Sequence, residues 1–209
     1  MEKKRMIFEL DNTLLTGDFK TTEEYFKSVY GYEKEILLDT LGENLRRYEK
    51  IFKRYTIEDL STFLTMKTNL QVTESILEGW LEALSEGKEE KEEDIRKTLE
   101  ELKRQGKSLV VLTNWFRTCQ KRRLEKEGLL EYFDEIYGGE EVIKPDKASY
   151  IAARDTYTPN ETVVIGPNLT NDYIIPRANC LESVLYDKEE GHHRTIVKVK
   201  RLNELVRKY

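Results

Sequence analysis

The chain has 209 residues, of which 38% are hydrophobic and 36% are charged, and its formal net charge is −5. This length suffices for one buried α/β core with a small inserted domain. The mild acidity argues against a nucleic-acid or anionic-membrane partner, and no apolar run approaches the roughly 18 residues that span a bilayer. Two cysteines far apart in the sequence indicate no disulfide framework, so we expect a cytoplasmic protein with reduced thiols.

The first predicted element is a short apolar strand over residues 5–10, which ends in the turn-forming sequence Asp11-Asn12-Thr13. From Thr21 to about Ser85, apolar residues recur at helical spacing. Thr56 and Thr73 are typical helix N-caps and predict helices over residues 57–65 and 74–84. Because this stretch contains no strand pattern, we expect residues 17–87 to form an all-helical insert, followed by a polar hinge over 86–94.

From Glu92 onward, predicted helices and strands alternate along the chain. The helices cover 95–105, 117–127, 147–156 and about 174–178, and the strands cover 108–113, 133–137, 162–165 and 183–186. The continuous apolar runs at 110–112 and 163–165 are typical of parallel strands covered on both faces. The alternation predicts an α/β fold, a Rossmann-like doubly wound parallel sheet of residues 1–16 and 88–209 carrying the helical insert.

Polar side chains follow each predicted strand of this core. In chain order they are Glu9 and Asp11, then Thr113 and Asn114, then Lys144, then Asp172. Ligands bind beyond the carboxyl ends of the strands in open parallel sheets, so we expect these groups to meet at one edge. Phosphoryl transfer uses groups of these kinds: carboxylates, a hydroxyl, an amide and an ammonium group.

These groups resemble the four motifs of the haloacid dehalogenase superfamily. The family pattern is Asp-x-Asp-x-Thr after a strand, then a Ser or Thr, then a Lys often followed by Pro-Asp, then Gly-Asp with a second Asp. The corresponding residues here are Glu9-x-Asp11-x-Thr13, Thr113, Lys144-Pro145-Asp146, and Gly166-Pro167 with Asp172. The resemblance covers the whole chain, and residues 17–87 fall where the family inserts its first-type helical cap.

The resemblance implies a phosphatase that uses Mg²⁺ and a small phosphorylated metabolite. It implies these roles: Glu9 as nucleophile or metal ligand, Asp11 as general acid/base and metal contact, Thr113 and Lys144 as phosphate ligands, and Asp172 as a metal ligand. Thr13, Asn114 and Trp115 are the residues that we expect to contact the substrate, with Trp115 at the edge of the site.

Two positions depart from the family pattern. Glu9 stands where the family has its nucleophilic Asp, and a displacement near 1 Å can cost on the order of 100-fold in a positioned reaction. Pro167 stands where the family has a metal-binding Asp, and it supplies neither a carboxylate nor an N–H. Since Mg²⁺ demands near-octahedral oxygen coordination, we expect it to bind weakly.

Two main hypotheses follow from these departures. The first is a phosphatase of weak or absent activity, and the alternative is a catalytically inactive member that serves as a ligand-binding or protein-interaction module. A third possibility is hydrolysis without a covalent intermediate, in which Glu9 activates a water molecule.

Overall fold

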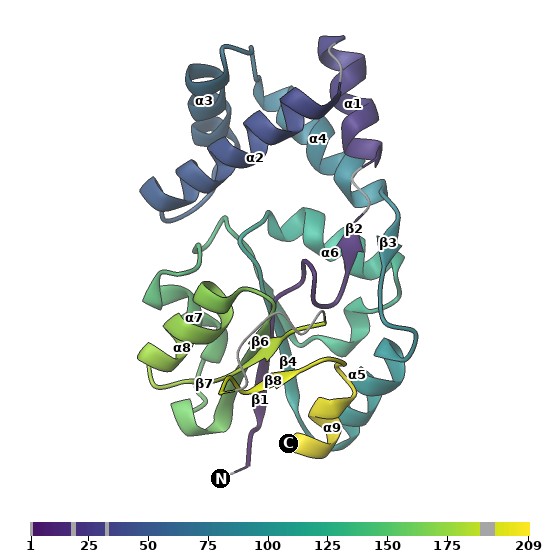
Figure 1. The fold of residues 1–209 in the computed structure, drawn as a ribbon, viewed down its shortest axis with the longest axis vertical. Helices are drawn as coiled ribbons and strands as arrows, with labels where there is room; N and C mark the ends of the chain where they lie inside the picture. Colours follow the sequence, from purple (N-terminus) through teal and green to yellow (C-terminus); the bar gives the residue numbers. More distant parts are fainter. Residues whose placement is uncertain (1, 18–19, 32–33, 189–194) are drawn as a thin grey trace.

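A central sheet of 6 parallel strands organises the molecule, in the order β5–β4–β1–β6–β7–β8. The computed structural model describes residues 2–17, 20–31, 34–188 and 195–209, with the side chains of 34–40 excepted (Figure 1). The strands are β1 (Arg5–Phe8), β4 (Ser108–Leu112), β5 (Glu135–Tyr137), β6 (Thr162–Gly166), β7 (Glu182–Tyr186) and β8 (Lys198–Val199). The predicted doubly wound α/β fold is confirmed, although the two-residue edge strand β8 was not predicted.

Helices cover both faces of this sheet, which explains its uninterrupted apolar strands. Residues Met6 and Phe8 of β1 join the cluster that contains side chains of α5 (Ile95–Arg104), α6 (Arg117–Lys126) and α9 (Glu204–Lys208). The intervening Ile7 packs with residues of α7 (Lys147–Arg154) and α8 (Ile175–Ala178) on the opposite face. Because successive side chains point to opposite faces of a strand, every position of β1 is buried.

The inserted segment contains the helices α1 (Lys20–Tyr30), α2 (Lys34–Ile51), α3 (Ile57–Thr68) and α4 (Glu74–Glu86). Figure 1 shows them together above one end of the sheet. The predicted N-caps are confirmed: Thr56 Oγ1 accepts from the Asp59 N–H at 3.0 Å, and Thr73 Oγ1 accepts from the Ile76 N–H at 3.3 Å. We refer to residues 20–86 as the cap and to the sheet with its covering helices as the core.

A short antiparallel ribbon joins the cap to the core. It pairs β2 (Thr16–Gly17) with β3 (Glu89–Glu90), so the segments that enter and leave the cap lie side by side. The sequence predicted only a polar hinge here, because two-residue strands leave no readable pattern. The predicted domain boundaries, at 16/17 and 87/88, fall at this ribbon and stay a prediction.

Aromatic residues fill the cap and continue into the core. Tyr48, Tyr55 and Trp80 belong to one buried cluster with Phe116 and Ile143 of the core. Two backbone hydrogen bonds cross the same seam, from Tyr55 N–H to Gly139 O at 2.7 Å and from Ile143 N–H to Lys53 O at 3.0 Å. The cap is thus packed onto the core, and its aromatic residues form part of the interior.

Neither cysteine forms a disulfide. Among the helices that the structure describes, none is long and apolar enough to cross a membrane.

The packing of α1 on α4 depends on Gly79, where an added Cβ would lie 2.3 Å from the Tyr25 hydroxyl oxygen. We predict that Gly79→Ala lowers the free energy of unfolding by about 1–3 kcal/mol, because the helices must separate. Gly42→Ala is the matched control, since its Cβ would meet only Arg46 at 3.8 Å and alanine favours the helix by about 0.5–1 kcal/mol. Urea unfolding measures both, and equal effects at the two sites would contradict the packing argument.

Candidate active site

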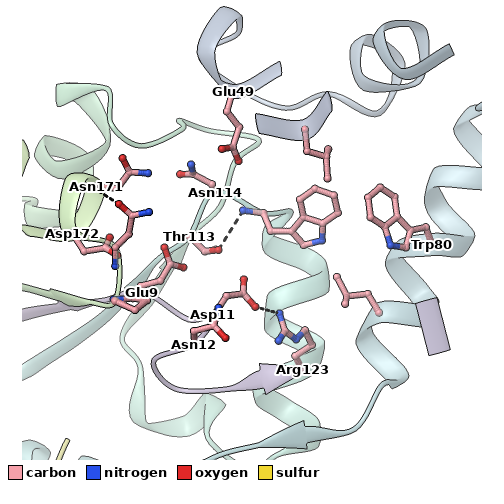
Figure 2. A pocket seen from close by; sticks show the side chains of 15 residues that line it. Glu9, Asp11, Asn12, Glu49, Trp80, Thr113, Asn114, Arg123, Asn171 and Asp172 are labelled. Atoms are coloured by element: carbon pink, nitrogen blue, oxygen red, sulfur yellow. Dashed lines mark hydrogen bonds and ion pairs between the residues drawn. The ribbon is translucent and has the colours of Figure 1, made fainter. Parts of the chain in front are cut away.

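The predicted residues meet where the chain reverses direction across the sheet. Strand β1 lies between β4 and β6, so the loops after these three strands surround a topological switch point. Between these loops and the cap lies a cavity of about 370 Å³ (Figure 2). The predicted residues that line it are Glu9, Asp11, Thr113, Asn114, Trp115 and Asp172.

A buried lysine joins two carboxylates on the floor of this cavity. Lys144 Nζ donates to Glu9 Oε2 and, at 2.7 Å, to Asp172 Oδ1. Lys144 is 2% exposed and Asp172 is 1% exposed. A cation at this depth needs paired anions, so the ammonium group links the end of β1 to the turn that follows β6.

Local structure brings Asp172 within reach of this lysine. Asp172 lies in a π-helical turn over Leu169–Ile174, whose N-cap is Asn168. The Asn168 backbone N–H donates to Asp172 Oδ2 at 3.0 Å. A Cβ on Gly166 would approach the same oxygen to 2.4 Å, so glycine at the end of β6 leaves room for the carboxylate.

Asn114 fixes the backbone of Lys144. Its Oδ1 accepts from the Lys144 N–H at 2.7 Å, and its Nδ2 donates to the Lys144 carbonyl oxygen at 3.0 Å. This amide pair ties the loop after β4 to the loop that carries the lysine. The predicted substrate contact at Asn114 therefore coexists with a structural task that the sequence did not reveal.

A second buried cation holds Asp11. Arg123 is 1% exposed, and its guanidinium donates to Asp11 Oδ1 at 2.6 Å and to both carboxylate oxygens of Glu89 in β3. Gln120 completes the arrangement, because its Nε2 donates to Asp11 Oδ2 at 2.8 Å and to Thr113 Oγ1 at 3.0 Å. The carboxylate of Asp11 is thus fixed at the cavity edge (Figure 2).

Sequence reasoning missed Arg123, although one signal was available. Arg123 follows Phe116 and Cys119 at intervals of three and four residues, so it falls on the buried face of α6. A charged residue on such a face requires an anionic partner. Its partners, Asp11 and Glu89, are distant in sequence, and no motif links either of them to Arg123.

Glu49 is a second residue that the sequence did not single out. It lies near the end of α2 and lines the cavity from the cap side, and the Tyr55 hydroxyl donates to its Oε1 at 3.0 Å. Burial raises the pKa of Glu49, against the lowering effects of hydrogen bonds from Tyr55 and Asn114.

The charge of Glu9 depends on its neighbours. Burial raises the pKa of Glu9 to about 7, the Lys144 ammonium opposes this rise, and the nearby Asp172 and Asp11 reinforce it. Burial by itself would lower the pKa of Lys144, but the attraction of Asp172 and Glu9 outweighs it and raises the pKa above its usual value. Lys144 is therefore an ammonium group at neutral pH, while Glu9 can exchange a proton there.

Two predicted residues do not line the cavity. Thr13 is 5% exposed, and its hydroxyl has no hydrogen-bond partner among the described residues. Lys144 is not among the lining residues, but it is paired with Glu9 and Asp172, which are. The catalytic and binding roles given to all of these residues stay predictions.

The donor set, as placed, is a poor one for Mg²⁺. The four carboxylate oxygens of Glu9 and Asp172 each accept a hydrogen bond, from Lys144, Leu10 or Asn168. Pro167 adds no oxygen ligand, and the described residues contain no group of three or more His, Cys, Asp or Glu side chains that could hold a metal ion. An ammonium lies between the two carboxylates, and Mg²⁺ requires six oxygens in near-octahedral geometry.

Comparison with known proteins gives matches over most of the chain. A model of the family described as haloacid dehalogenase-like hydrolase matches residues 6–178. Ribulose-1,5-bisphosphate 5-phosphatase of Halopiger xanaduensis is 36% identical over 106 residues, 49% of this chain and 44% of that protein. The aligned region therefore spans less than half of this relative.

Several solved structures share the fold. L-2-haloacid dehalogenase from Xanthobacter autotrophicus superimposes with a TM-score of 0.74 at 16% identity, covering 98% of this chain and 97% of that one. A HAD phosphatase from Thermococcus onnurineus gives 0.68 at 22% identity, covering 98% and 96%. A magnesium-bound HAD hydrolase from Bacillus subtilis gives 0.70 at 19% identity, covering 99% and 98%.

We predict that Lys144→Met lowers the free energy of unfolding by about 3–5 kcal/mol, because it leaves two buried carboxylates without a cation. The loss should be smaller at about pH 5.5 than at about pH 8. The Lys144 ammonium opposes the rise in the pKa of Glu9, so its removal raises that pKa further. The folded variant then gains more stability from acid than the wild type does.

Urea unfolding at the two pH values measures this effect. Lys53→Met is the control, because the Lys53 side chain is 85% exposed and its surface ion pair contributes at most about 1 kcal/mol. A loss at Lys144 no larger than at Lys53 would contradict the buried linkage.

Proposed function

The chain belongs to the haloacid dehalogenase-like hydrolase family, and from that premise we propose that it binds a small phosphorylated metabolite and hydrolyses it slowly. The convergence of Glu9, Asp11, Thr113 and Asp172 on one cavity supports this proposal. These side chains come from three strand ends that are distant in sequence, as a shared reaction centre requires.

Each side chain has a task that its contacts permit. Thr113 Oγ1 accepts hydrogen bonds from Gln120 and from the Trp115 N–H, which leaves its own proton for a phosphate oxygen. Asp11 is oriented by Arg123 and can transfer a proton at the cavity edge. Glu9 is the nucleophile or, in a reaction without a covalent intermediate, the base that activates water.

The same contacts favour slow turnover. Glu9 Oε1 accepts from the Leu10 N–H at 2.8 Å, and Oε2 accepts from Lys144. To attack phosphorus, one oxygen must leave its donor, and the longer Glu side chain must also find the geometry of an Asp. Magnesium, which would neutralise phosphate charge when bound, has a poor donor set here, so we propose weak binding.

A catalytically inactive binding module is the second candidate. The observation that favours it is the Glu9–Lys144–Asp172 linkage beside Pro167. The Lys144 ammonium already pairs with the two carboxylates that catalysis would use. In that case the cavity and cap retain a ligand without transforming it.

With p-nitrophenyl phosphate and Mg²⁺, we predict a wild-type rate near background. Glu9→Asp combined with Pro167→Asp should raise the rate on the order of 100-fold, because both carboxylates regain the family geometry. Adding Asp11→Asn to that double variant should remove the gain. Strong wild-type turnover that Asp11→Asn abolishes would contradict the weak-activity proposal and exclude the inactive module.

Millimolar Mg²⁺ should raise the melting temperature of the wild type by less than about 2 °C, because a ligand stabilises only as far as it binds the folded state. The double variant should respond more strongly to Mg²⁺, with Ca²⁺-free buffer and an EDTA sample as references. A large wild-type shift would count against the poor donor set.

A further inference from the structure

The cap side of the cavity differs chemically from its floor. The cap contributes Leu45, Glu49, Trp80 and Leu84 to the lining. In Figure 2, Glu49 extends from the cap toward the core, on the opposite side of the cavity from Glu9 and Asp11. A phosphate group held at the floor therefore places the organic part of its ester against apolar rings and one carboxyl group.

The balance of charge in the cavity is negative. Carboxyl groups line it at Glu9, Asp11, Glu49 and Asp172, whereas Arg123 is the one cationic side chain among the described lining residues. Arg123 is already bound to Asp11 and Glu89, and Lys144 is bound to Glu9 and Asp172. A ligand phosphate at the floor meets no free cation among these lining residues and would rely on neutral donors such as the Thr113 hydroxyl. A second anionic group would add to the repulsion, since buried like charges repel strongly.

Glu49 forms no ion pair with any residue that the structure describes. Its hydrogen-bond partners are the hydroxyl of Tyr55 and the side chain of Asn114, both neutral. A partly buried carboxyl group without an ion-pair partner is less stable than one that is paired. Lys144 and Arg46 attract Glu49 electrostatically but form no ion pair with it, so Glu49 can still accept a cationic group of a ligand.

Two indole rings line the same cavity as this carboxyl group. The ring centroids of Trp80 and Trp115 are 5.1 Å apart at an interplanar angle of 60°, and both rings line the cavity with Glu49. Indole faces attract ammonium groups within about 6 Å of the ring centroid, most strongly where water is excluded. Aromatic faces next to a carboxylate form a site suited to an ammonium group.

We propose that the ligand is a phosphate monoester of an amino alcohol, whose ammonium group lies between Glu49 and the Trp80 and Trp115 rings. The inference rests on the proposed function, because it requires the phosphate to occupy the floor of the cavity. In this proposal, Glu49 repels ligands that carry a second phosphate or a carboxylate. Ribulose-1,5-bisphosphate, the substrate named for the Halopiger xanaduensis relative, carries such a second phosphate.

The test is calorimetric titration of the whole wild-type chain with four probes. They are 2-aminoethyl phosphate, phosphocholine, 2-hydroxyethyl phosphate and ribulose-1,5-bisphosphate. The first and third differ only in ammonium against hydroxyl. We expect the two ammonium esters to bind at least about tenfold more tightly than the hydroxyl ester, and the bisphosphate to bind most weakly.

Glu49→Gln preserves the size of the side chain and should reduce the ammonium preference to less than about threefold, with binding of the hydroxyl ester retained. Glu43→Gln is the matched control, since Glu43 lies on the same helix and is paired with Arg47 at the surface, and it should leave the preference unchanged. Melting curves establish that both variants are folded.

Equal binding of 2-aminoethyl and 2-hydroxyethyl phosphate, or a preference that survives Glu49→Gln, would overturn the inference and leave the proposed function intact. Absence of binding by all four esters would overturn both. Tightest binding of the bisphosphate would identify a second anion site and reject the role given to Glu49.

Discussion

The Lys144 ammonium, buried between Glu9 and Asp172, is the interaction on which the site depends. Each of the three groups comes from a different part of the sheet edge, and none could remain charged at this depth without the others. The linkage therefore fixes the relative positions of the loops after β1, β5 and β6. It also bears on the proposed chemistry, because the ammonium engages both Glu9, the proposed nucleophile, and Asp172, the proposed metal ligand.

A second linkage of the same kind runs through Arg123. It connects Asp11, at the edge of the cavity, to Glu89 in the ribbon that leads out of the cap. The carboxylate with the predicted proton-transfer role is thus held by the same guanidinium group that holds the cap connection. Both linkages lie on the core side of the cavity, so the proposed reaction groups all come from the core. The proposed ammonium site instead combines Glu49 and Trp80 of the cap with Trp115 of the core.

The sequence predicted those features that depend on local chemistry. Thr56 and Thr73 begin helices because their hydroxyls reach backbone N–H groups three residues away. The apolar runs predicted the buried strands, and the motif order predicted which residues meet. Arg123 and the β2–β3 ribbon were missed because their partners lie 34 or more positions away, as Glu89 does from Arg123. Glu49 was missed because it faces the cavity only once α2 is packed over the core. No local pattern records such a pairing.

Tyr55 connects the cap, the core and the cavity. Its backbone N–H bonds to Gly139 of the core, and its hydroxyl bonds to Glu49. Tyr55 therefore bonds both to the core and to the carboxyl group that we propose binds the ligand. If Glu49 binds the ligand as proposed, ligand binding and the packing of the cap on the core are coupled through Tyr55, and the coupling acts equally in both directions.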